Sequence, residues 1–289
     1  MFNRLFHHWL LKRFKAPRRA HTRHPTDLGL NATEKTLQTP HGPLFAWWIE
    51  YPQPSINRPV AIVLHGWGAN ASDMLDMAPY LQTLGCHILL FDARCHGNSA
   101  DADFTSMPRF AEDLEAARAW VLSQQHTLQS PLVAVGHSVG AAAVLLSASR
   151  TQWAAVVSMS AFAHPADMMW RFLREHRLNF PGLGDWILKH VQQTIGFQFD
   201  DIAPQNTIQK IACPVLLVHG AQDQDVPLAE AQKLSACSPE HCELIVVQGV
   251  GHDLRPAIAT LAPSVGEFIQ VNIFQNEFAP NRMFQSDLG

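Results

Sequence analysis

The sequence has few cysteines, and it lacks the patterns in which cysteine usually builds structure. Its five cysteines are odd in number and form neither a Cys-x-x-Cys pair nor a histidine-spaced zinc pattern. In a chain of this length, that usage predicts reduced, mostly buried thiols in the cytoplasm rather than a disulfide framework. The sequence also has no apolar run long enough to span a bilayer, and it contains no internal repeat or low-complexity tract.

Acidic residues are absent from the first 24 positions, which contain seven lysines and arginines. The remaining residues include 14 basic and 25 acidic side chains, so the body of the protein is mildly acidic. Nucleic acid is therefore not expected as a partner, because phosphate binding needs a basic face. The 289 residues are 47% hydrophobic and 16% charged, which suits one large α/β domain with an insertion, or at most two domains.

The N-terminal stretch combines basic and aromatic residues at helical spacing. Residues 1–14 place phenylalanine, tryptophan and leucine side chains on one face, with Arg4, Lys12 and Arg13 around them. Such a helix can lie at a membrane surface, so we expect peripheral contact with the inner face of an anionic membrane. The alternative is a helix or arm packed on the body or on a partner. A secretory signal is not expected, because the longest apolar run within residues 1–14 is three residues and no small-residue cleavage site follows it.

Short, continuous apolar runs recur along the chain and predict buried strands. The expected strands are residues 60–64, 87–91, 131–135, 154–159, 214–220 and 243–247, preceded by a hairpin of residues 36–39 and 44–49. Helical patterns separate them, over residues 72–84 with Ser72 as the N-cap, and over 108–125, 141–148, 228–236 and 256–273. This alternation predicts an α/β fold with a mostly parallel central sheet and helices on both faces.

The alternation stops between residues 161 and 210, where prolines and glycines interrupt apolar stretches. We expect short helices here, forming a cap over the catalytic edge of the sheet. The predicted organisation is a basic helix and linker (1–33), an α/β core (34–160 and 211–274), a helical cap (161–210) and a loose tail (275–289). The cap residues Met168, Met169 and Trp170 are expected either to pack as core or to line a pocket.

The sequence Gly136-His137-Ser138-Val139-Gly140 lies between a predicted strand and a predicted helix. Glycines two positions either side of a serine are typical of a sharp turn that lifts a nucleophilic hydroxyl out of the sheet. Ser158 and Ser160 also follow a strand but lack the flanking glycines. We therefore expect Ser138 to be the nucleophile.

A serine nucleophile needs a base oriented by a carboxylate, and the chain offers both at strand ends. Asp223 follows one predicted strand and His252 follows the last one. In an open parallel sheet these edges converge on one crevice, so the side chains can meet. The backbone N–H groups of Val139 and Trp67 are the expected oxyanion donors.

At this point the chain resembles the α/β-hydrolase superfamily over residues 34–273. The resemblance rests on five segments in order: HGWG at 65–68, DARCHGNS at 92–99, GHSVG at 136–140, HGAQDQDVP at 219–227 and GHD at 251–253. The second and fourth are similar to those of its esterase, thioesterase and serine-aminopeptidase-like branches. The spacing to Val226-Pro227 favours Asp223 as the acid, with Asp225 as the alternative.

The resemblance also assigns supporting roles. His65, Gly66 and His137 are expected to shape the loops around the site without transferring protons. Arg94 and His96 are expected to brace the oxyanion loop.

The expected activity is hydrolysis of a carboxylic ester or thioester through an acyl-enzyme, with no cofactor and no metal. Three alternatives stay open. The first is a peptidase or amide hydrolase, the second an acyltransferase on the same triad, and the third a non-catalytic binding scaffold.

Overall fold

The computed structural model describes residues 7, 11–12, 15–53, 57–180 and 182–274. The helix predicted over residues 1–14 lies largely outside these residues, and the tail predicted from residue 275 lies entirely outside them. Within the described part of the chain, no helix has both the length and the apolar character needed to cross a membrane.

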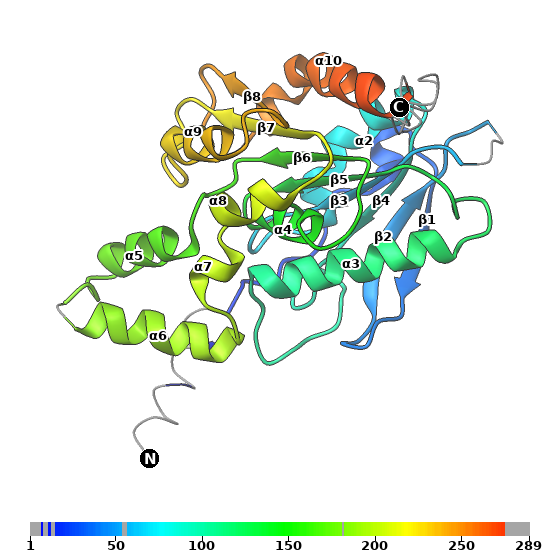
Figure 1. The fold of residues 1–289 in the computed structure, drawn as a ribbon. Coiled ribbons are helices and arrows are strands. Elements are labelled where there is room, and N and C mark those ends of the chain that lie inside the picture. The colour runs from blue at the N-terminus through cyan, green and yellow to red at the C-terminus, as the bar shows by residue number, and fades with distance from the viewer. Residues whose placement is uncertain (1–6, 8–10, 13–14, 54–56, 181, 275–289) are drawn as a thin grey trace, which may run out of the picture.

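Strands and helices alternate along the chain (Figure 1). The strands are β1 (Ala32–Leu37), β2 (Leu44–Ile49), β3 (Val60–Leu64), β4 (His87–Phe91), β5 (Leu132–His137), β6 (Ala155–Met159), β7 (Val215–Gly220) and β8 (Cys242–Val247). The α-helices are α2 (Ala78–Thr83), α3 (Met107–Ser123), α4 (Val139–Ala148), α5 (Pro165–Glu175), α6 (Leu183–Ile195), α7 (Phe199–Ile202), α8 (Pro204–Thr207), α9 (Leu228–Cys237) and α10 (Ile258–Ile269). Short helical turns are η1 (Pro25–Leu28), η2 (Ala71–Met77), η3 (Ile208–Lys210), η4 (Arg255–Ala257) and η5 (Gln270–Phe274).

The eight strands form one sheet in the order β1-β2-β4-β3-β5-β6-β7-β8. β1 and β2 are a hairpin, and β2 also pairs with β4 antiparallel, whereas all the other neighbours are parallel. The mostly parallel sheet is therefore confirmed. The hairpin begins four residues earlier than expected, because its register pairs Ala32 with Ile49.

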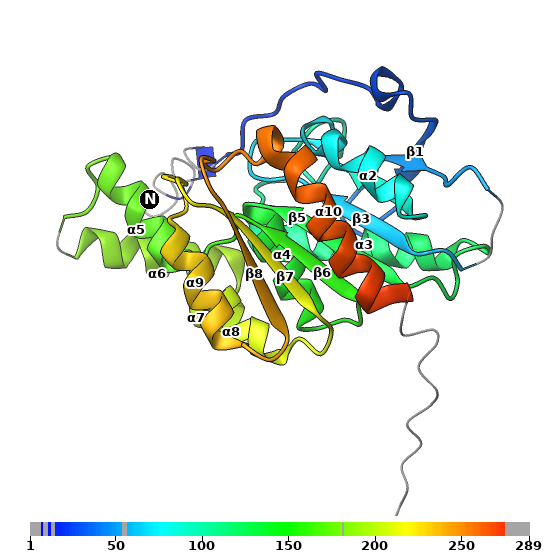
Figure 2. The same cartoon turned by 90° about the horizontal axis from the view of Figure 1, so that it is seen from above.

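Both faces of the sheet are buried, which explains why the strand sequences are continuously apolar. In β3, Ile62 and Leu64 pack into the cluster that contains α3 and α4, whereas Ala61 and Val63 pack into the cluster that contains α10. Alternate residues of a strand point to opposite faces, so a strand covered on both faces needs apolar side chains at every position. The helices lie on the two sides of the sheet accordingly (Figures 1 and 2).

The prediction of one helix over residues 72–84 with Ser72 as its N-cap is wrong in the type of its first half and in the identity of the cap. The structure has the 3₁₀ turn η2 followed by α2, and the N-cap is Asn70. The Asn70 side chain accepts the N–H of Ser72, while the Asp73 carboxylate accepts the N–H of Asn70, which is a reciprocal capping arrangement. Pro79 lies in the first turn of α2, where its missing N–H costs no helical hydrogen bond.

The described residues between 161 and 210 form helices and loops and contain no strand, as the interrupted pattern predicted. Helices α5 and α6 extend from the body of the molecule in both views (Figures 1 and 2), and α7 and α8 lead back to β7. A side chain at Gly184 of α6 would collide with the indole of Trp170 on α5. The two helices therefore approach closely at this point, and Trp170 packs between them.

Candidate active site

Ser138 lies at the turn between β5 and α4, in a backbone conformation that is rare for a residue with a side chain. Its φ is 56° and its ψ is −120°. A Cβ at Gly136 would collide with the backbone of Gly140, and a Cβ at Gly140 would collide with the carbonyl of His65. Only glycine fits at these two positions, so the turn can be this sharp and bring the 65–68 loop beside Ser138.

The structure brings the three predicted polar side chains into one hydrogen-bonded chain. His252 Nε2 lies 2.9 Å from Ser138 Oγ, and His252 Nδ1 lies 2.8 Å from Asp223 Oδ2. A carboxylate can only accept, so Nδ1–H donates to Asp223 and Nε2 is left to accept the hydroxyl proton of Ser138. The three residues follow β5, β7 and β8, whose carboxyl ends lie at one edge of the parallel sheet.

Asp223 is held as a carboxylate by several donors. Its Oδ1 accepts the N–H groups of Asp225 (3.0 Å) and Val226 (2.8 Å), and His219 Nε2 lies 3.4 Å from Oδ2. Burial raises the pKa of Asp223, but hydrogen bonds from His219, His252 and Val226 outweigh burial and hold that pKa well below its usual range. Asp225 contributes its backbone N–H here, and its side chain is exposed. Of the two aspartates, Asp223 is therefore the one that orients His252.

Two side chains hold the backbone of His252. His137 Nε2–H donates to the His252 carbonyl at 2.9 Å, and Ser160 Oγ donates to the same oxygen at 3.4 Å. Burial lowers the pKa of His137 to about 4, so this imidazole is neutral near pH 7. His137 therefore holds the backbone of the loop that carries His252.

The loop of residues 65–70, here called the oxyanion loop, packs directly against Ser138. A Cβ at Gly66 would lie 3.0 Å from the Cβ of Ser138. The Gly66 carbonyl accepts from His65 Nδ1–H at 2.7 Å and from the N–H of Ala69 at 3.2 Å. This carbonyl and the N–H of Trp67 belong to one planar trans peptide and point in opposite directions. Holding the carbonyl thus sets the direction of the Trp67 N–H.

A second histidine holds the next peptide of the oxyanion loop. His96 Nε2 accepts the N–H of Gly68 at 3.0 Å, while its Nδ1–H donates to the Arg94 carbonyl at 3.0 Å. Burial lowers the pKa of His96, and burial together with the neighbouring His96 lowers that of His65 to about 3. Both rings are therefore neutral, which they must be because each Nε2 accepts an N–H group, that of Ala93 at His65 (3.0 Å) and that of Gly68 at His96.

Arg94 supports this region differently from the expectation. Its guanidinium does not reach the oxyanion loop but pairs with Asp113 and Glu112 on α3, at 2.6 and 3.0 Å. Arg94 contributes to the loop only through the carbonyl that orients His96. Its side chain is buried, and it ties the turn after β4 to α3.

Two cavities meet at Ser138. One has a volume of about 300 Å³, lies against α5 and α6, and is lined mainly by apolar side chains that include Met168, Met169 and Phe162. Trp170 is not among its lining residues. The other cavity, of about 250 Å³, has charged side chains in its wall, among them Arg19 and Arg255.

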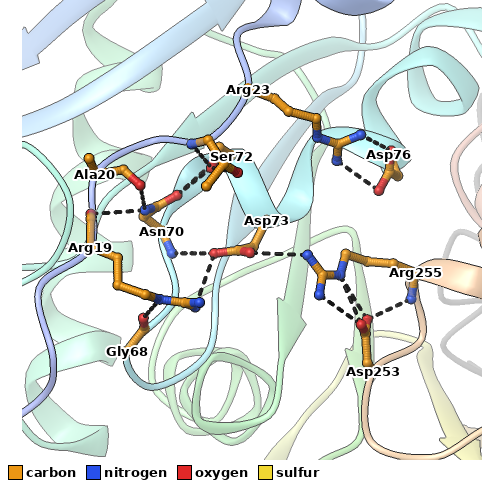
Figure 3. Close-up of polar contacts among 11 residues, drawn as sticks. Arg19, Ala20, Arg23, Gly68, Asn70, Ser72, Asp73, Asp76, Asp253 and Arg255 are labelled. Carbon is orange, nitrogen blue, oxygen red and sulfur yellow. Dashed lines mark hydrogen bonds and ion pairs between the residues drawn. The ribbon is translucent and has the colours of Figure 1, made fainter.

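These charges form a network that the sequence did not indicate (Figure 3). Asp73 pairs with Arg19 at 3.5 Å and with Arg255 at 3.2 Å, and Arg255 also pairs with Asp253 at 2.7 Å. Arg23 makes two hydrogen bonds of 2.8 Å with Asp76. The partners are up to 182 positions apart in sequence, so no local pattern could have revealed them. His219 was missed as well, although it lies inside one of the segments that carry the resemblance.

One group of described residues has the composition of a metal site. Ligand-type atoms of Asp223, Asp225 and His252 lie within 4.8 Å of one another. In this structure the Nδ1 of His252 is already engaged by Asp223 Oδ2, so a metal ion at that position would have to compete with this hydrogen bond.

Known proteins resemble parts of the chain. A family model described as serine aminopeptidase, S33, matches residues 56–197. An uncharacterized protein of Mycobacterium tuberculosis is 28% identical over 195 residues, which are 68% of this chain and 63% of that protein. The lysophosphatidylserine lipase of Danio rerio is 28% identical over 193 residues, which are 62% of this chain and 47% of the lipase. The chain thus spans less than two thirds of the length of these relatives.

Solved structures share the fold more extensively. An esterase of Pyrococcus furiosus superposes with a TM-score of 0.72 at 23% identity, over 90% of this chain and 98% of the esterase. Est1E of Butyrivibrio proteoclasticus superposes with a TM-score of 0.65 at 19% identity, over 83% of this chain and 99% of that protein. At such identities the likeness concerns the fold. The sheet order, the turn at Ser138 and these structural neighbours agree, and the chain has the α/β-hydrolase fold.

Proposed function

We propose that the protein is a serine hydrolase that cleaves a carboxylic ester or thioester through an acyl-enzyme intermediate. The observation that carries this proposal is the unbroken chain of hydrogen bonds from Ser138 Oγ through His252 to Asp223. A hydroxyl becomes a useful nucleophile at neutral pH when a base within hydrogen-bond reach can take its proton. The esterase neighbours and the lipase relative are consistent with this chemistry.

In the proposed reaction, Ser138 Oγ attacks the substrate carbonyl carbon while His252 Nε2 takes the hydroxyl proton. The N–H groups of Trp67 and Val139 stabilise the negative oxygen of the tetrahedral intermediate. His252 then gives its proton to the departing alcohol or thiol, which leaves an acyl group on Ser138. A water molecule, deprotonated by His252, attacks this acyl group, releases the carboxylic acid and restores the serine. Asp223 holds the imidazole in the required tautomer throughout.

The cavity of about 300 Å³ is the proposed site for the acyl group. It reaches from Ser138 and Val139 to Met168 and Met169 on α5, and its wall is mainly apolar. Burying an apolar chain there is favourable by about 0.8 kcal/mol for each methylene group. We therefore propose a substrate with an apolar acyl chain bound under the helical cap, which we assign to residues 161–210 beside a core of 34–160 and 211–274.

The proposal is tested by the hydrolysis of p-nitrophenyl esters from acetyl to palmitoyl. We expect the wild type to be active and Ser138→Ala to lose about 10⁴-fold or more in kcat, because the nucleophile is gone. Ser158→Ala is the matched control. Ser158 is a buried serine inside the neighbouring strand β6, and its hydroxyl donates to the Ala141 carbonyl and not to His252. A fluorophosphonate should label the wild type and not Ser138→Ala.

Other outcomes lead elsewhere. Activity that survives in Ser138→Ala would exclude Ser138 as the nucleophile. A wild type that hydrolyses aminoacyl p-nitroanilides faster than esters would favour the peptidase alternative. A wild type that neither reacts with any of these substrates nor takes up the fluorophosphonate would favour a non-catalytic scaffold. Transfer of the acyl group to added glycerol in preference to water would favour an acyltransferase.

We further propose that the protein is cytoplasmic and that residues 1–14 contact an anionic membrane. The support is the basic, aromatic composition of that stretch and the five cysteines, none of which is paired in the structure. Deleting residues 1–14 should reduce binding to phosphatidylglycerol vesicles and leave hydrolysis of p-nitrophenyl acetate unchanged. Equal vesicle binding by the shortened protein would contradict the membrane proposal.

A further inference from the structure

The segment of residues 15–31, here called the arm, crosses the edge of the site and bonds to the loops behind it. Arg18 donates to the carbonyls of Gly97 and Ser99, both at 2.8 Å. His21 bonds to Asp92 at 2.8 Å, and Arg23 bonds to Asp76 (Figure 3). Asp92 in turn accepts the N–H groups of Ala71 and Asn98. The arm is therefore held at several points along its length.

Two arm residues, Arg19 and Ala20, bond directly to the oxyanion loop, and Arg19 is the one that does so through its side chain. Arg19 Nε–H donates to the Gly68 carbonyl at 2.6 Å. In the other direction, the Asn70 side chain of the loop donates to the backbone carbonyls of Arg19 and Ala20 (Figure 3). Gly68 has a φ of +67°, and a Cβ there would collide with Pro17. The loop backbone thus lies directly against the arm. Among the described residues, Arg19 supplies the single hydrogen bond to this carbonyl.

This bond reaches the Trp67 N–H through two planar peptides. The Gly68 carbonyl and the Ala69 N–H belong to one peptide, so Arg19 fixes the orientation of that N–H. The Ala69 N–H donates to the Gly66 carbonyl, and that carbonyl shares a peptide with the Trp67 N–H. His65 and His96 hold the other two points of the same loop.

We propose that Arg19 is a positioning residue for the oxyanion loop, acting with His65 and His96 to aim the Trp67 N–H. This inference rests on the proposed function. An oxyanion donor must already point at the place where negative charge develops, because reorienting it during the reaction would raise the barrier. Removing a donor outright costs about 10²–10³-fold in kcat, so loosening one should cost less, on the order of 10-fold.

The surroundings of Arg19 separate this role from a purely structural one. Its side chain is 57% exposed, and its nearest carboxylate, on Asp73, is 3.5 Å away. Exposed ion pairs contribute little to stability, so losing the Arg19 charge should barely change the melting temperature. Arg23 lies on the same arm and makes a closer ion pair, with Asp76, but does not touch the oxyanion loop. Arg23→Ala is therefore the matched control for weakened docking of the arm.

The experiment compares the wild type with Arg19→Ala, Arg19→Lys and Arg23→Ala on a p-nitrophenyl ester. We expect Arg19→Ala to lower kcat about 10-fold with KM nearly unchanged, because the lost interaction is made in the transition state. Affinity for an alkyl boronic acid, whose tetrahedral adduct places an oxygen in the oxyanion site, should fall by the same factor. Arg19→Lys keeps the charge but loses the planar Nε–H donor, and it should recover only part of kcat. Arg23→Ala should match the wild type.

Each contrary result overturns the inference. An unchanged kcat in Arg19→Ala would exclude the positioning role. A rise in KM alone would make Arg19 a substrate contact, since it lines the cavity of about 250 Å³. Equal losses in Arg19→Ala and Arg23→Ala, with equally lowered melting temperatures, would assign the effect to docking of the arm. A wild type without esterase activity or fluorophosphonate labelling would overturn the proposed function as well, whereas an active wild type confines any failure to Arg19.

Discussion

Asp223 and Asp225 are two positions apart, yet the fold gives them opposite surroundings. The Asp223 carboxylate is buried and meets His252, whereas the Asp225 side chain is exposed. The Asp225 backbone instead donates to Asp223 Oδ1, together with that of Val226. The segment after β7 thus wraps its N–H groups around one carboxylate, which keeps that carboxylate ionised and fixed in place.

The two aspartates should therefore respond differently to the same substitution. Asp223→Asn should lower kcat by about 10⁴-fold, because an amide can donate to His252 Nδ1 and stabilise the wrong tautomer. Asp225→Asn should lose no more than a few fold. Steady-state kinetics on one p-nitrophenyl ester measures both variants. Comparable losses in the two would show that Asp225 takes part in orienting the base.

At the scale of elements, the large side chains of helix α5 lie in two different surroundings. Met168 and Met169 of α5 line the apolar cavity beside Ser138. Trp170, the next residue, packs against Gly184 of α6 and holds the two helices together. Successive residues of a helix point about 100° apart, so neighbours in sequence can serve a cavity and a helix contact. Of the two placements expected for these side chains, Trp170 has the packed one, whereas Met168 and Met169 line a cavity.

Enlarging a cavity residue should shorten the preferred acyl chain. Met169→Trp fills part of the cavity, so we expect activity on palmitoyl and decanoyl esters to fall at least about 10-fold, while acetyl ester hydrolysis stays near the wild type. Trp170→Phe is the control, and its chain-length profile should keep the wild-type optimum. The prediction fails if Met169→Trp leaves the profile unchanged, since the acyl chain would then bind elsewhere.

At the scale of the whole molecule, neutral histidines lie in the interior. Burial lowers the pKa of His65 to about 3 and that of His137 to about 4. In the unfolded chain, both rings take up a proton at histidine's ordinary value of about 6.5. Between that pH and pH 4 the unfolded state binds more protons than the folded state. The contribution of these two histidines to the free energy of unfolding is therefore complete above pH 6.5, and it is lost as the pH is lowered below that value.

The two histidines together should lower the free energy of unfolding by roughly 4 kcal/mol between pH 7 and pH 5. Urea unfolding at the two pH values measures this loss. His65→Gln should remove about half of it, because one proton fewer is taken up on unfolding. His41→Gln is the control, since this histidine is exposed in the folded protein. Equal pH dependence in His65→Gln and the wild type would contradict the assignment.

Much of the fold and of the candidate site could be predicted because the signals are local. Each buried strand has its own apolar run, and the turn at Ser138 is specified by Gly136 and Gly140, which no larger residue can replace. Asp223 and His252 each follow a strand directly, and parallel topology then brings strand ends together. The start of η2 was misplaced because Asn70, Ser72 and Asp73 are all good capping residues, and only their mutual hydrogen bonds decide between them.

The sequence alone determined the order of the strands and helices, the sharp turn that carries Ser138, and the positions of Asp223 and His252 after strands, since these depend on neighbours along the chain. The tertiary structure decided that Arg94 pairs with α3, that Met169 rather than Trp170 lines the cavity, and that Arg19 reaches Gly68. Arg19 and Gly68 are 49 positions apart. Contacts of this kind depend on how separate segments pack together, and no periodicity or motif within either segment encodes them.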